Sequence, residues 1–264
     1  MFGRGGNGSL RGWVGACCLL ALSASAAADE SAVRLASGAE IVSQRYPAGG
    51  PLLAVWITGQ DGRVEAEHQA AADLAGQGVE TWLTDFLAPY FLPLVASSWG
   101  RVPDADLAEW LEDLRQRQPG RRIVLVGTGR AAALALRAVQ AWRALHGRDG
   151  QPVAGALLLY PLLYREMEPG REPEYEPVVS QTRLDLVILQ PRSSAGYWWR
   201  ERLKSFLEGA GSRVWLTVLP GLRDGFYRRS DINAEEAAAG QRLGRIVLEG
   251  LAPLFEASPA KARP

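Results

Sequence analysis

Short apolar runs alternate with amphipathic stretches along most of the chain. Residues 33–44 read as a small edge hairpin about Ser37 and Gly38, and residues 52–57 are continuously apolar, as in a buried strand. Further strands are predicted at 79–83, 122–126, 153–160, 184–190 and 213–219, and helices at 63–77, 104–118, 130–146, 197–209 and 234–255. The alternation predicts an α/β domain whose mostly parallel sheet carries helices on both faces.

One segment departs from this alternation. Residues 164–179 combine three prolines with several glutamates, and Pro161 comes just before them. Prolines interrupt helices, so a loop is predicted here. A mobile lid over a site is one interpretation, but the composition favours a solvated excursion.

The N-terminal stretch has the layout of a secretory signal peptide. Arg4 and Arg11 precede an apolar run at 13–22, and small residues follow up to Ala26 or Ala28. The predicted organisation is therefore a cleaved signal at 1–28, one domain at 29–257 and a disordered tail at 258–264. The apolar run is about half the length that a membrane span needs, so no integral span is expected in the mature chain, and a periplasmic or secreted location follows.

Composition narrows the chemistry. The 264 residues are 47% hydrophobic, which suffices for the core of one α/β domain. Twenty-nine basic and 29 acidic residues leave no net field to attract nucleic acid. Both cysteines, Cys17 and Cys18, lie in the predicted signal, and lipidation at Cys17 is a minor alternative to cleavage. His68 and His146 are far apart in the sequence, which argues against zinc, and no cofactor is expected.

The most informative motif is the segment IVLVGTGRAAALAL. A predicted buried strand runs through Gly127, Thr128, Gly129, Arg130 and Ala131 directly into an alanine-rich helix. This context resembles the nucleophile elbow of the α/β hydrolases, whose pattern is G-x-S-x-G. The succession of hairpin, strands and helices resembles that superfamily over nearly the whole mature chain, and the resemblance implies the α/β-hydrolase fold.

The resemblance also shows three departures at the catalytic positions. Gly129 occupies the position of the nucleophilic serine, and a glycine has no side chain with which to attack a carbonyl. The loop at 191–196, where the acid would be, contains Arg192 and no carboxylate. After the last strand, Asp224 stands before Gly225 and Phe226 where the family has its histidine. His68 and His146 are interpreted as ordinary helix residues.

The altered elbow is still expected to offer backbone amides to an anion, from Arg130 and from the turn at 58–60. A cation at the start of a helix opposes the helix dipole, so Arg130 needs an anionic neighbour. We predict either an Arg130–Asp224 ion pair or an anionic ligand held by Arg130. The candidate ligand-binding residues are Gly59, Gln60, Arg63, Thr128, Gly129, Arg130, Arg192, Tyr197 and Asp224.

Three functional hypotheses follow. The favoured one is a non-catalytic protein that binds a small anionic or carbonyl-bearing ligand, or a periplasmic protein partner. The alternative is an active esterase-like hydrolase with relocated residues, in which Thr128 or Ser193 is the nucleophile and Asp224 the base. Its weakness is that Arg223 is expected to lower the pKa of Asp224. In the third, an interaction protein, the pocket is filled by the protein's own side chains.

Overall fold

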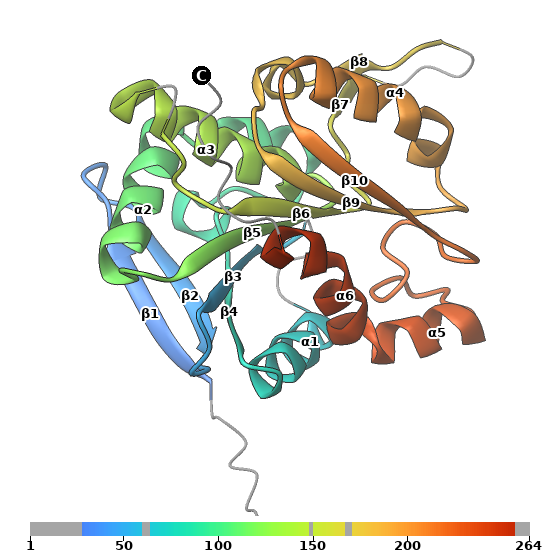
Figure 1. Cartoon of the computed structure of the whole chain (residues 1–264), viewed down its shortest axis with the longest axis horizontal. Coiled ribbons are helices and arrows are strands. Elements are labelled where there is room, and N and C mark those ends of the chain that lie inside the picture. Colours follow the sequence, from blue (N-terminus) through green and yellow to red (C-terminus); the bar gives the residue numbers. More distant parts are fainter. Residues whose placement is uncertain (1–27, 60–63, 148–149, 167–170, 257–264) are drawn as a thin grey trace, which may run out of the picture.

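The computed structural model describes residues 28–59, 64–147, 150–166 and 171–256. Within this part of the chain, eight strands form one sheet in the order β1-β2-β4-β3-β5-β6-β9-β10 (Figure 1). The strands are β1 Asp29–Arg34, β2 Glu40–Tyr46, β3 Leu52–Ile57, β4 Val79–Thr84, β5 Arg122–Thr128, β6 Gly155–Leu159, β9 Asp185–Pro191 and β10 Arg213–Leu219. Only the pairings of β2 with β1 and β4 are antiparallel, which confirms the mostly parallel sheet and its N-terminal edge hairpin.

Helices cover both faces of the sheet, as predicted (Figure 1). They are α1 Glu65–Gly76, α2 Asp104–Arg117, α3 Ala131–His146, α4 Ala195–Gly209, α5 Ala234–Gln241 and α6 Leu243–Glu256. One buried cluster joins the sheet to α2, α3 and α4 through residues such as Leu111 and Leu207. The other joins the opposite face to α1 and α6 through residues such as Leu74 and Val247. Because these strands are parallel, the loops that connect their carboxyl ends to the packed helices lie together at one end of the sheet.

Two predicted segments differ from the structure. The single helix expected at 234–255 is two helices, because Arg242, at φ −108° and ψ 15°, leaves the helical conformation between α5 and α6. The loop expected at 164–179 contains a small antiparallel ribbon, β7 Tyr164–Glu166 with β8 Glu174–Tyr175, and a short 3-10 helix, η3 Pro177–Gln181. Burial of Tyr164, Val178 and Val179 against the domain explains this order.

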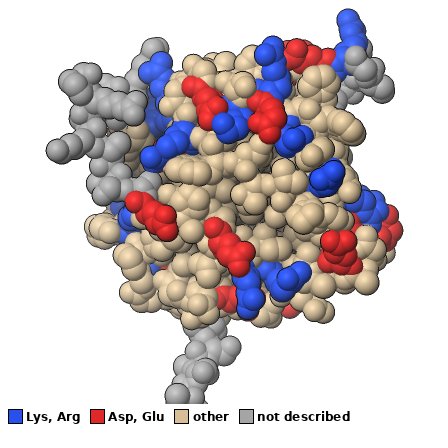
Figure 2. Space-filling view, turned by 45° about the vertical axis from the view of Figure 1, so that its right-hand side comes forward, with Lys and Arg blue, Asp and Glu red and all other residues tan. Residues whose placement is uncertain are grey.

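The surface carries charges of both signs. Figure 2 shows acidic and basic side chains interspersed around a broad uncharged area, as the balanced composition predicts. Among the described residues, no helix has the length and apolar character needed to cross a bilayer. The predicted signal peptide, Cys17 and Cys18, and residues 258–264 of the predicted tail lie outside the described residues.

Candidate functional site at the strand-to-helix elbow

The turn between β5 and α3 is built on two glycines with different roles. Gly129 has φ +55°, a left-handed conformation that glycine adopts at low cost. A Cβ on Gly127 would lie 2.6 Å from the Cα of Ala132, so only glycine allows strand and helix to approach this closely. The predicted sharp strand-to-helix turn is therefore present in the structure.

Backbone hydrogen bonds hold the elbow against the end of β6. The N–H of Gly129 donates to the carbonyl oxygen of Leu159 at 3.0 Å, and the N–H of Leu162 donates to the Gly129 carbonyl at 2.9 Å. Tyr160, between these two contacts, is buried and has φ +40°, an unusual value for a residue with a bulky side chain. Its ring is thereby directed at the elbow, and a Cβ on Gly129 would lie 3.3 Å from its Cε2 atom.

Arg228 fills the other side of the elbow. A Cβ on Gly59, which follows β3, would lie 2.6 Å from the Nη1 atom of Arg228, and a Cβ on Gly129 would lie 3.8 Å from its Nη2 atom. The guanidinium therefore lies between Gly59 and Gly129, and it sits 5.6 Å from the centre of the Tyr160 ring. An arginine and a tyrosine of the protein itself thus take the space around the nucleophile position.

A chain of buried hydroxyl groups continues from Tyr160 towards α1. The hydroxyls of Tyr160 and Tyr227 are 3.0 Å apart, and the Tyr227 hydroxyl donates to Oε1 of Glu67 at 2.7 Å. Glu67 is fully buried in the first turn of α1, where a carboxylate is favourable to the helix dipole. Burial raises the pKa of both tyrosines, while Arg228 lowers it. Both tyrosines are therefore neutral at physiological pH.

Asp224 is partly buried in the loop after β10. Burial raises its pKa to about 6, although the neighbouring Ser194 hydroxyl and the charges of Arg228 and Arg229 act in the opposite direction. The expectation that Arg223 controls this pKa is wrong. The guanidinium of Arg223 is engaged by Glu236, its Nε donating at 2.7 Å, and by Asp231 at 2.9 Å, so it faces α5.

The loop expected to carry the catalytic acid instead supplies a helix cap. Ser194 accepts from the N–H of Tyr197 at the start of α4 and from the side-chain amide of Gln190 at 2.7 Å. Arg192 is exposed, and its guanidinium lies 5.7 Å from the centre of the Tyr197 ring. The Ser194 hydroxyl, which also donates to the Pro191 carbonyl oxygen at 2.9 Å, is thus a capping group, and this loop offers Asp224 no second carboxylate.

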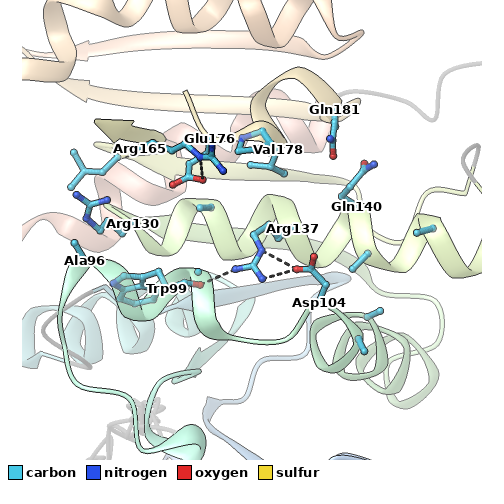
Figure 3. Close-up of a pocket in the computed structure, with 18 of the residues that line it drawn as sticks. Ala96, Trp99, Asp104, Arg130, Arg137, Gln140, Arg165, Glu176, Val178 and Gln181 are labelled. Atoms are coloured by element: carbon cyan, nitrogen blue, oxygen red, sulfur yellow. Dashed lines mark hydrogen bonds and ion pairs between the residues drawn. The ribbon is translucent and has the colours of Figure 1, made fainter. Parts of the chain in front are cut away.

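The predicted Arg130–Asp224 ion pair does not form. Asp224 has its charge contacts with Arg228 and Arg229, which follow it in the chain. Arg130 lines a different hollow with Trp99 and Arg137, on the side of α3 that faces α2 (Figure 3). Arg130 is the N-cap of α3, with φ −73° and ψ −24°, and makes no side-chain cap hydrogen bond. Among the described residues it has no ion-pair partner.

The remaining candidates divide into three groups. Gly59, Thr128 and Gly129 lie together at the elbow with Asp224 in the neighbouring loop, whereas Arg192 and Tyr197 lie at the start of α4. Gln60 and Arg63 lie outside the described residues. Of the alternative nucleophiles, Thr128 is fully buried and Ser193 is exposed, with its N–H bonded to the Leu222 carbonyl.

Both histidines have structural contacts. Nδ1 of His68 is 2.6 Å from the hydroxyl of Tyr46, and the ring of His146 stacks on Trp142 with centroids 4.4 Å apart. Neither histidine comes from the loops that follow the strands, so neither belongs to the elbow.

Comparison with known proteins defines the class of fold. The sequence matches no family model and shows no significant match to a curated protein. An esterase of Pyrobaculum calidifontis is 16% identical, with 84% of this chain and 85% of the esterase aligned at a TM-score of 0.60. Thermogutta terrifontis esterase 2, phosphoramylated by tabun, is 17% identical, with 88% of this chain and 96% of the esterase aligned at a TM-score of 0.57. Carboxyl esterase 2 of Tuber melanosporum is 12% identical, with 87% of this chain and 89% of the esterase aligned at a TM-score of 0.59.

The chain therefore has the α/β-hydrolase fold, as its elbow motif predicted. At these identities the likeness concerns the fold, and the chemistry has to be judged from the side chains present at the elbow.

Four residues at or next to the elbow were not predicted from the sequence: Glu67, Tyr160, Tyr227 and Arg228. Glu67 had a weak signal, since a glutamate on the inner face of a predicted helix needs a buried partner. Tyr160 was predicted only as the last residue of the strand at 153–160, and no local pattern marked Tyr227. Arg228 had no local signal, because only the three-dimensional path after Gly225 directs it to the elbow.

Proposed function

We propose that this chain is an exported, non-catalytic protein of the α/β-hydrolase fold, which acts by binding and not by acyl transfer. The observation that carries the proposal is the position of the Arg228 guanidinium between Gly59 and Gly129. Together with the Tyr160 ring, it takes the space that a substrate carbonyl and a nucleophile would need. This favours an interaction protein, whose pocket is filled by its own side chains, over a protein that binds a small ligand at the elbow.

The charges around the elbow support the same conclusion. General-base catalysis contributes roughly 100-fold to 10,000-fold to reactions of this kind, and Asp224 has no aligned nucleophile that it could deprotonate. Ser194 is held as a helix cap, and Thr128 is fully buried. The positive charge of Arg228 instead lies near the carboxyl group of Asp224 and near the hydroxyls of Tyr160 and Tyr227. Relocated catalysis therefore has no support in the arrangement of these groups.

A fluorophosphonate probe, followed by mass spectrometry, tests the proposal on the mature protein. We expect no stoichiometric labelling, because no hydroxyl at the elbow is both activated and accessible. Stoichiometric modification of any native serine or threonine would refute the non-catalytic proposal.

A restoration series tests the role of Arg228. The double variant Gly129→Ser, Asp224→His supplies a nucleophile and a base, yet it should react only weakly with the probe while Arg228 is present. Addition of Arg228→Gly should raise the labelling rate of Ser at this position. Arg229→Gly on the same background is the matched control, since Arg229 is exposed and paired with Asp231 at 2.8 Å. Equal rates with both additions would show that Arg228 does not block the elbow.

A further inference from the structure

A groove of about 760 Å³ runs along α3, outside the elbow. Its walls come from α2 and the preceding 3-10 helix η2 (Ala96–Arg101) on one side, and from β7 and η3 on the other. We call it the α3 groove, and define it by Trp99, Ala108, Arg130, Arg137, Gln140 and Gln181. Several alanines line it, which lets a ligand approach the backbone of α3 closely.

Two hydrogen-bond donors lie at one end of the α3 groove (Figure 3). Arg130 has no ion-pair partner within the described part of the chain. Trp99 is only 5% exposed, and its buried indole N–H lacks a hydrogen-bond partner among the described residues. A buried N–H without a partner is costly, so a small shift of the Trp99 ring that lets a ligand acceptor reach it would remove that cost. The Arg130 guanidinium at the same end of the groove suits a carboxylate.

The other charges of the α3 groove are already satisfied. Arg137 donates to the Asp104 carboxylate at 2.9 Å and to the carbonyl oxygens of Trp99 and Val102 at 2.8 and 2.6 Å. Arg165 is paired with Glu174 at 3.1 Å. Arg130 is therefore the one arginine of the groove that is left to bind an anion, as judged from the described residues.

Two side-chain amides lie at the opposite end. Figure 3 shows Gln140, from α3, facing Gln181, from η3. Neither amide makes a hydrogen bond with the described residues. Gln140 lies ten positions after Arg130, the N-cap of α3, which corresponds to about 15 Å along the helix axis. An extended peptide of four or five residues covers about the same length.

We propose that the α3 groove binds the C-terminal end of a peptide or protein. Its terminal carboxylate contacts Arg130 and Trp99, its apolar side chains lie against the alanines, and a backbone amide four or five residues earlier bonds to Gln140 and Gln181. Charge complementarity selects this occupant, because the groove offers one unpaired cation at one end and amides at the other. The inference names the partner for the proposed binding function, but does not require that hydrolysis be absent.

Fluorescence anisotropy with a labelled pentapeptide of alternating alanine and leucine tests the inference. The peptide with a free C-terminal carboxylate should bind at least about tenfold more tightly than the same peptide with a C-terminal amide, since charge-assisted hydrogen bonds are the stronger kind. Equal affinity, or no binding of either peptide, would overturn the inference.

Variants locate the binding. Arg130→Gln should remove the preference for the carboxylate and Arg130→Lys should restore part of it, whereas Arg192→Gln, at an exposed arginine outside the groove, should have no effect. Ala141→Phe should weaken binding of both peptides by narrowing the groove. Unchanged binding in both Arg130→Gln and Ala141→Phe would place the peptide elsewhere and overturn the inference.

A binding experiment with a fatty acid distinguishes a peptide site from a site for other carboxylates. Dodecanoate carries the same charged group on an alkyl chain without amides. Binding of dodecanoate without binding of the peptide would show a site for amphiphiles and overturn the inference. Failure of these tests would leave the fluorophosphonate result unaffected, so the two proposals are tested separately.

Discussion

Replacement of Gly129 by alanine should destabilise the protein for two separable reasons. A residue with a Cβ at φ +55° costs about 1–2 kcal/mol relative to the right-handed region. The new methyl group would also lie 3.3 Å from Cε2 of Tyr160, a tighter contact than side chains normally make. Tyr160 has little room to move, because it is buried and its hydroxyl is 3.0 Å from that of Tyr227.

Gly120 provides a matched control for the backbone contribution. It has φ +80°, and a Cβ there would meet no atom within 4 Å. Gly120→Ala therefore carries the backbone cost alone, partly offset by about 0.4–1 kcal/mol from the lower entropy of the unfolded chain.

We expect Gly129→Ala to lower the free energy of unfolding by about 2 kcal/mol, and Gly120→Ala by about 1 kcal/mol or less. For a domain of this size, 2 kcal/mol corresponds to a fall in Tm of about 4–8 °C. Urea and thermal denaturation of both variants measure the difference. If Gly129→Ala is no more destabilising than Gly120→Ala, then Tyr160 does not crowd the nucleophile position.

Three further predictions concern the groups around the elbow. The pKa of Asp224 is raised to about 6, so the contribution of Asp224 to the free energy of unfolding should fall by at most ~3 kcal/mol as pH rises from about 4 to about 6. Urea denaturation of Asp224→Asn at several pH values should lack this fall. If the free energy of unfolding changed with pH in the same way in both proteins, the raised pKa would be assigned to the wrong group. Tyr227→Phe removes a donor to the buried Glu67 carboxylate and should cost about 1.5–3 kcal/mol in chemical denaturation, more than Tyr160→Phe. Gly127→Ala, whose Cβ would lie 2.6 Å from the helix backbone, should impair folding more than Gly129→Ala, as judged by soluble yield and Tm.

The elbow shows that the strand-to-helix turn of the α/β-hydrolase fold does not need a serine at the nucleophile position. The strand-to-helix turn depends on Gly127 and on the backbone bonds between Gly129 and the end of β6, and neither requires a serine side chain. The same turn therefore forms with a glycine at the nucleophile position. Arg228 and Tyr160 lie around this position, and the Tyr160 hydroxyl belongs to a buried polar group with Tyr227 and Glu67.

Local patterns in the sequence determined the succession of elements. Apolar runs gave the strands β3, β5 and β9 to within about two residues, because a buried strand needs continuous apolar side chains. The glycine-rich motif after β5 located the elbow, and the residues at its catalytic positions could be read directly. Periodicity did not predict the break near Arg242 or the β7–β8 ribbon, since both depend on packing against distant parts of the chain.

Tertiary structure alone decided which side chains meet at the elbow. Arg130 was expected beside Asp224, but it lines the α3 groove, and Arg228 lies near Asp224 instead. The pKa of Asp224 likewise depends on burial, which its neighbours in the sequence do not reveal. The sequence by itself determined the fold and placed Gly129 and Asp224 at the positions that resemble those of the family's nucleophile and base. Only the folded chain decided which side chains surround these positions, because the contacts of Arg228 join residues that are far apart in the sequence.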